Sequence, residues 1–121
     1  MIDSAALRAY CLKKPGTTED TPFDEVTLVF RVMNKMYALL DTEGVPTTVN
    51  LKCDPERAIE LRERYDAVQP GYHQNKKHWN TVTLDGSISD GEIRGMIDHS
   101  YELVVAGLSR AERERVSKVR G

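Results

Sequence analysis

The stretch GTTEDTPFDEVTLVFRVMNKMYALLDTEGVPTTVNLKC, residues Gly16–Cys53, decides the fold class. It is rich in Val, Leu, Thr and aromatic residues, which favour extended backbone, and it is interrupted by turn-forming residues. A tight hairpin is expected at Asn34-Lys35 and a longer connection at Asp41–Gly44. The pattern therefore predicts an antiparallel meander with two projecting hairpins and strands over Glu25–Met33, Met36–Asp41 and Thr47–Lys52.

Helices are predicted on both sides of this meander. The first covers Asp3–Lys14 and is stopped by Pro15-Gly16. A second begins after Asp54, with Pro55 at its first position. A third begins at the capping box SDGE, Ser89–Glu92. Its apolar residues recur at helical spacing and form a continuous stripe: Ile93, Met96, Ile97, Tyr101, Val104, Val105 and Leu108.

Two further strands lie between the second and third helices. Residues Ala67–Tyr72 give a weak extended signal, whereas WNTVTLDG alternates strictly. Asn80, Val82 and Leu84 would share one side of that strand, and Trp79, Thr81 and Thr83 the other. The whole order is α-β-β-β-α-β-β-α. It predicts an α+β fold, a two-layer sandwich in which an antiparallel sheet of about five strands carries its helices on one face and leaves the other open.

Length and composition agree with a globular domain. The chain has 121 residues, of which 40% are hydrophobic and 30% charged. It contains no apolar run of membrane-spanning length and no secretory signal at its start, so no membrane partner is expected. Cys11 and Cys53 are far apart in sequence, which indicates reduced thiols and a cytoplasmic location. We expect one domain over residues 1–108, followed by a charged C-terminal helix extension or tail over residues 109–121.

Charge is unevenly distributed. The net charge is −2, but the tail Ser109–Gly121 carries five Arg and Lys against two Glu, or +3, which leaves −5 on the other 108 residues. An acidic body argues against a general polyanion binder, because non-specific nucleic-acid affinity comes mostly from neutralised phosphates. A local basic patch stays open as an alternative.

The segment GYHQNKKHWNTVTLDG, Gly71–Gly86, concentrates two histidines, two lysines and the only tryptophan. One interpretation is structural: His73, His78 and Trp79 pack a turn against the sheet. A second is a phosphate-and-stacking patch, in which lysines neutralise phosphates, asparagines reach base edges and an exposed indole stacks on a base. A metal site is disfavoured because the spacing of His73 and His78 matches no usual ligand pattern and no nearby cysteine completes a set.

Catalytic motifs are absent from the sequence. It has no G-x-S-x-G, no H-E-x-x-H and no glycine-rich phosphate loop, so we expect neither an enzyme nor a cofactor. The acidic group Glu19, Asp20, Asp24 and Glu25 admits two interpretations, a cation site or a means of keeping an edge strand soluble.

Three motifs carry a family resemblance: LKCDPE, PGYHQNKKHWNTV and LDGSISDGEI. With DEVTLVFRVMNKMYALL upstream, they resemble the MmcQ/YjbR family of small bacterial proteins over roughly Met1 to Leu108. The resemblance implies a two-layer fold similar to secretion chaperones and frataxin (CyaY-like proteins). It also implies DNA binding through a "double wing", for which the hairpins at Asn34-Lys35 and Asp41–Gly44 are the natural candidates. Only the first of these is basic.

The leading hypothesis is therefore a non-enzymatic DNA-binding protein that contacts mainly phosphates with low sequence specificity. The alternative is a protein-interaction module, or a homodimer, that uses the open sheet face. The residues expected to contact nucleic acid are Arg31, Lys35, Tyr72, His73, Lys76, Lys77, His78, Trp79 and Asn80.

Overall fold

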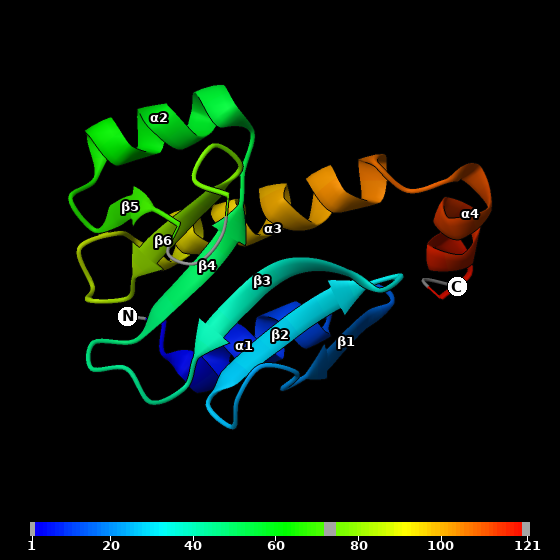
Figure 1. Cartoon of the computed structure of the whole chain (residues 1–121), viewed down its shortest axis with the longest axis horizontal. Helices are drawn as coiled ribbons and strands as arrows, with labels where there is room; N and C mark the ends of the chain where they lie inside the picture. Colours follow the sequence, from blue (N-terminus) through cyan, green and yellow to red (C-terminus); the bar gives the residue numbers. More distant parts are fainter. Residues whose placement is uncertain (1, 72–74, 120–121) are drawn as a thin grey trace.

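The computed structural model describes residues 2–71 and 75–119 and shows a single sheet with helices packed on one side (Figure 1). Four helices and six strands make up this part of the chain. The elements in chain order are α1 (Ser4–Leu12), β1 (Thr17–Asp20), β2 (Thr27–Val32), β3 (Lys35–Asp41), β4 (Thr48–Lys52), α2 (Pro55–Arg64), β5 (Val68–Pro70), β6 (Trp79–Thr83), α3 (Asp90–Ala106) and α4 (Arg110–Val119). None of the helices described is long and apolar enough to cross a membrane.

The sheet confirms the predicted α+β sandwich. Its strands run in the order β1-β2-β3-β4-β6-β5, and every neighbouring pair is antiparallel. The β2–β3 hairpin turns at Met33 and Asn34, whose φ angles are 49° and 65°. Positive φ at both central residues is what a two-residue hairpin turn compatible with strand twist requires. The turn therefore lies one residue earlier than the sequence predicted.

The helices begin where their capping residues predict. The Asp54 side chain accepts hydrogen bonds from the backbone N–H groups of Glu56 and Arg57, and the Ser89 hydroxyl accepts one from that of Glu92. Each cap satisfies backbone donors that would otherwise lack a partner at a helix start. The predicted stripe is buried in the main core together with Leu7 and Cys11 of α1, except that Val105 is only partly buried and Leu108 lies just beyond the end of α3.

The opposite face of the sheet carries a second, smaller cluster. Trp79 packs there with Val29 and Leu39, while Val82 and Leu84 of the same segment lie in the helix-covered core. The alternation predicted for WNTVTLDG is thus confirmed. Trp79 is only 7% exposed although no helix covers that face. The open face therefore has a small apolar cluster of its own.

One strand was not predicted, and the expected C-terminal helix extension takes a different form. β1 is an edge strand of sequence TTED, which lacks the apolar alternation that identifies a half-buried strand; its extended state comes from pairing with β2. The segment after Leu108 forms a separate helix, α4, because a break at residues 107–109 ends α3. Val116 of α4 is buried in the main core, and α4 lies beyond the β2–β3 hairpin (Figure 1).

Candidate functional site

Strand register separates the charges of the sheet into two ends. Because all strands are antiparallel, β2 and β4 end where β3 and β6 begin. Five cationic residues occupy this end: Arg31, Lys35, Lys52, Lys76 and Lys77. We call this group the basic end. The loops at the other end carry carboxylates: Asp24, Glu25, Asp41 and Glu43. Although the protein is negative overall, five of its lysine and arginine residues are thus gathered at one end of the sheet.

The loop between β5 and β6 presents the lysine pair. Its two sides are held by a bond from the Gly71 N–H to the Trp79 carbonyl, 2.9 Å long, and the Cys53 N–H donates to the His78 carbonyl at 2.7 Å. Lys76 and Lys77 are exposed, and His78 is half-buried. The predicted contacts Tyr72 and His73 lie outside the described residues. The backbone around His78 therefore fixes the loop to the sheet and leaves the lysine side chains in solvent.

Trp79 and Asn80 lie on opposite faces of β6. The Trp79 indole is buried on the open face, so it presents little ring surface for stacking on a base. Asn80 is 2% exposed on the helix side. Its amide accepts a 2.7 Å hydrogen bond from Arg62 Nε and donates a 3.3 Å bond to the Ala58 carbonyl. In this geometry the buried Asn80 side chain connects β6 to α2.

Arg62 is a residue that the sequence analysis missed. Its guanidinium also donates to the carbonyls of Lys76 and Trp79, so one side chain joins α2 to both the lysine loop and β6. An arginine in the helix repeat ERAIELRER carries no sequence signal for this role, because the partners are defined only by the register of β6.

The two remaining predicted contacts lie at the β2–β3 hairpin. Lys35 is exposed, and Arg31 is half-buried with its Nε 3.4 Å from Asp20 of β1. Lys35 also lies near α4, where it adds to the effect of the Ser109 N–H in lowering the pKa of Glu112. The first hairpin is thus positively charged and adjoins α4, whereas the β3–β4 connection carries Asp41 and Glu43.

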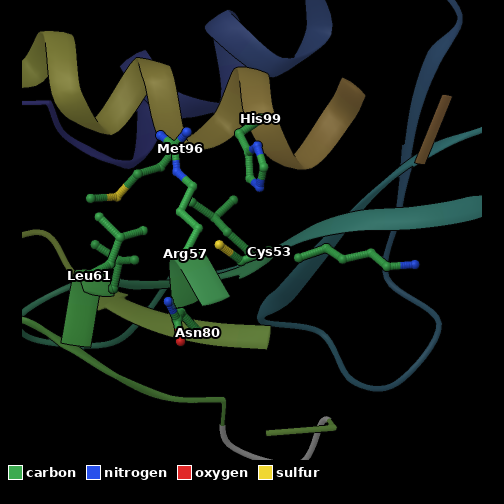
Figure 2. Close-up of a pocket in the computed structure, with 9 residues that line it drawn as sticks. Cys53, Arg57, Leu61, Asn80, Met96 and His99 are labelled. Carbon is green, nitrogen blue, oxygen red and sulfur yellow. The ribbon is translucent and has the colours of Figure 1, made fainter. Parts of the chain in front are cut away.

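A second place where polar side chains meet lies between α2, α3 and the sheet (Figure 2). Figure 2 shows Arg57 extending from α2 toward α3, where Met96 and His99 also line the pocket. Cys53 and Asn80 line the sheet side. The free space at its centre is about 10 Å³, at the lower limit for one water molecule. This pocket is too small for a substrate.

Burial favours the neutral forms of His99 and Cys53 in this pocket. The Asp54 N–H donates to His99 Nε2 at 3.2 Å, so the imidazole proton lies on Nδ1. Burial, with a smaller contribution from Arg57, lowers the pKa of His99. Burial raises the pKa of the Cys53 thiol to about 11. A nucleophilic cysteine needs a lowered pKa, so the pair lacks the property of a catalytic Cys-His dyad.

Metal-ligating side chains do not converge in the part of the chain that the structure describes: no three His, Cys, Asp or Glu residues there are placed to hold an ion. The acidic group of the sequence is divided between partners. Glu19 pairs with Arg8 on the helix side, Asp20 with Arg31, and Asp24 caps a turn. Edge strand β1 carries two of these acids, as expected for a strand kept soluble by charge.

Comparison with known proteins identifies the family. The family model described as YjbR matches residues 12–103. The chain belongs to the YjbR family. YjbR of Escherichia coli K12 is 35% identical over 108 residues, which cover 89% of this chain and 92% of that protein. YyaQ of Bacillus subtilis 168 is 32% identical over 105 residues, covering 75% of this chain and 88% of that protein.

Solved structures of similar proteins share the fold. The crystal structure of Deinococcus radiodurans protein DR2400, with a domain described as DUF419, is 43% identical, has a TM-score of 0.90, and covers 97% of this chain and 89% of its own. A crystal structure from Pseudomonas syringae is 32% identical with a TM-score of 0.73, covering 84% of this chain and 98% of its own. The YjbR fold therefore accounts for nearly the whole chain.

Proposed function

We propose that this YjbR-family protein is a non-enzymatic DNA-binding protein that contacts phosphates through the basic end. The supporting observation is the antiparallel register, which places cationic residues from four separate segments at the basic end of the sheet, in a protein whose net charge is negative. Lysine and arginine side chains supply most backbone contacts in such interfaces, and these contacts position a protein without reading sequence.

The lysines of the basic end are available for this role. Lys52, Lys76 and Lys77 form no ion pair with any carboxylate in the described ranges, and Lys76 and Lys77 are exposed. Lys52 pairs with Trp79 across β4 and β6, which places it on the open face. Since Trp79 is buried and Asn80 faces α2, the proposed contacts reduce to charged groups, which agrees with low sequence specificity.

The proposal predicts a specific dependence on salt. Each neutralised phosphate contributes about −0.9 to the slope of log K against log[salt] on duplex DNA. Four to five contacts therefore give a slope of about −4 and roughly a 100-fold to 500-fold loss of affinity between 50 and 200 mM salt. Fluorescence anisotropy with labelled duplex and single-stranded oligonucleotides measures both the affinity and the slope.

Replacing two lysines tests the location. In Lys76→Ala/Lys77→Ala the slope should become shallower by about 2, equally for unrelated sequences. Arg64→Ala/Arg94→Ala removes the same charge from exposed positions in α2 and α3, away from the basic end, and should leave the slope unchanged. Absence of binding to either oligonucleotide at low salt, or an equal effect of both double variants, would refute the proposal.

A further inference from the structure

The acidic end of the open face contains a hollow that the proposed function does not use. Its volume is about 720 Å³, within the range of small-molecule sites in proteins. Leu39, Asn50 and Thr83, from three adjacent strands, belong to its floor, and the β1–β2 loop contributes Phe23 and Asp24. Figure 1 shows that the β1–β2 and β3–β4 connections lie at the same end of the sheet, which is where the hollow forms.

Two carboxylates give the hollow its charge. Asp24 Oδ1 accepts hydrogen bonds from the N–H groups of Val26 and Thr27, at 2.9 and 2.7 Å, and Asp41 Oδ1 accepts two from the β3–β4 loop, both 3.0 Å. The backbone bonds to Asp24 lower its pKa. Thr27 donates its N–H to Asp24 and is also the cross-strand partner of Asp41 on β3. Both carboxylates are therefore next to Thr27. Among the described residues that line the hollow there is no lysine, arginine or histidine to offset them.

The floor offers neutral hydrogen-bonding groups. The Thr81 hydroxyl donates to Asn50 Oδ1 at 2.6 Å, which fixes the orientation of that amide and directs its NH₂ group away from Thr81. Thr48 and Thr83 pair across β4 and β6 and add two hydroxyls that can donate or accept. A ligand on this floor would gain bonds through hydroxyl groups of its own.

The rim carries the apolar element. Phe23 is 61% exposed and lines the hollow beside Asp24. An exposed aromatic ring next to fixed carboxylates can cover the C–H face of a ring while also attracting a cation. Size, charge, hydroxyl-bearing floor and aromatic rim together define the chemistry of the occupant.

We propose that this hollow binds a small hydroxylated organic amine, with its ammonium groups at Asp24 and Asp41, its hydroxyls on the threonine and asparagine floor, and its ring against Phe23. The disaccharide of glucosamine is the probe that matches this description, since it carries two ammonium groups on a hydroxylated frame. The site is independent of the proposed nucleic-acid contacts, which lie at the other end of the sheet.

The experiment compares three probes by isothermal titration calorimetry and by amide chemical shifts. The glucosamine disaccharide should bind saturably, while cellobiose, which has the same frame without charge, should bind at least about tenfold more weakly. Spermidine carries charge without ring or hydroxyls and should also bind more weakly. The amides of Thr48, Asn50 and Thr83 should shift with the disaccharide.

Two double variants test the carboxylates. Asp24→Asn/Asp41→Asn keeps the turns, because asparagine forms the same side-chain turn as aspartate, and should reduce affinity for the disaccharide by about tenfold or more. Glu60→Gln/Asp85→Asn removes equal charge outside the hollow, with Asp85 in a comparable turn to Ser87, and should not change it. Spermidine binding as tightly as the disaccharide, equal losses in both variants, or no binding of the disaccharide at about 10 mM would overturn the proposal.

Discussion

The connection between Asn80 and Arg62 gives the sharpest quantitative prediction. Asn80→Ala removes a charge-assisted hydrogen bond to Arg62 Nε and a neutral bond to the Ala58 carbonyl. Bonds to charged groups contribute about 1.5–3 kcal/mol and neutral ones about 0.5–1.5 kcal/mol. Because the Ala58 carbonyl lies inside α2, where a helical bond can still satisfy it, we expect a loss of about 2–4 kcal/mol in the free energy of unfolding.

Thermal unfolding monitored by circular dichroism measures this loss. For a chain of 121 residues the entropy of unfolding makes 1 kcal/mol equivalent to about 4 °C, so Tm should fall by roughly 8–16 °C. Arg62→Ala should also destabilise the fold, since Arg62 additionally holds the carbonyls of Lys76 and Trp79. The double variant should be less destabilised than the sum, with a coupling of about 1–2 kcal/mol.

Two results would refute this reasoning. A loss below about 0.5 kcal/mol for Asn80→Ala is the size expected of an ordinary surface change, and it would show that the amide does not hold α2 to β6. A marked loss of DNA affinity in Asn80→Ala, at a temperature where the variant is fully folded, would show that Asn80 contacts nucleic acid after all. Lys76→Ala/Lys77→Ala should behave in the opposite way, with normal stability and weakened binding.

Two further predictions follow from the titratable groups. The folded state lowers the pKa of His99 below its ordinary 6.5. The neutral imidazole therefore contributes stability that is present above pH 6.5 and is lost as pH falls through the lowered pKa. Urea unfolding from pH 5 to 7 should show the free energy of unfolding decreasing toward low pH in the native protein, and decreasing less in His99→Gln. Burial raises the pKa of the thiols, to about 12 for Cys11 and about 11 for Cys53, so both should resist Ellman's reagent at pH 8 in the folded state and react fully in guanidinium. Rapid reaction of either thiol in the folded protein would contradict the second prediction.

The sequence was sufficient for the parts of the fold that depend on local periodicity. The stripe of α3, the caps at Asp54 and Ser89, and the alternation around Val82 each follow from spacing alone, and the structure has them as predicted. Strand β1 could not be predicted because TTED has no apolar face, and its extended backbone depends on β2 beside it.

The candidate site shows a different limit. The alternation that placed Val82 toward the helices also placed Asn80 there, so its position was predictable, but its partner Arg62 was not. Trp79 was assigned to the correct face, yet its exposure depends on the cluster with Val29 and Leu39 from strands far away in the sequence. The proximity of Lys52 to the Lys76 loop could not be predicted either, because it depends on the register between β4 and β6.

The small apolar cluster on the open face has a practical consequence. Its central residue is the only tryptophan of the chain, and it lies in β6 directly after the lysine loop. Through Leu39, the same cluster adjoins the hollow at the acidic end. One unlabelled chromophore, with no competing indole emission, is therefore placed between the two surfaces for which ligands are proposed. Its fluorescence can therefore report occupancy of either surface without a dye.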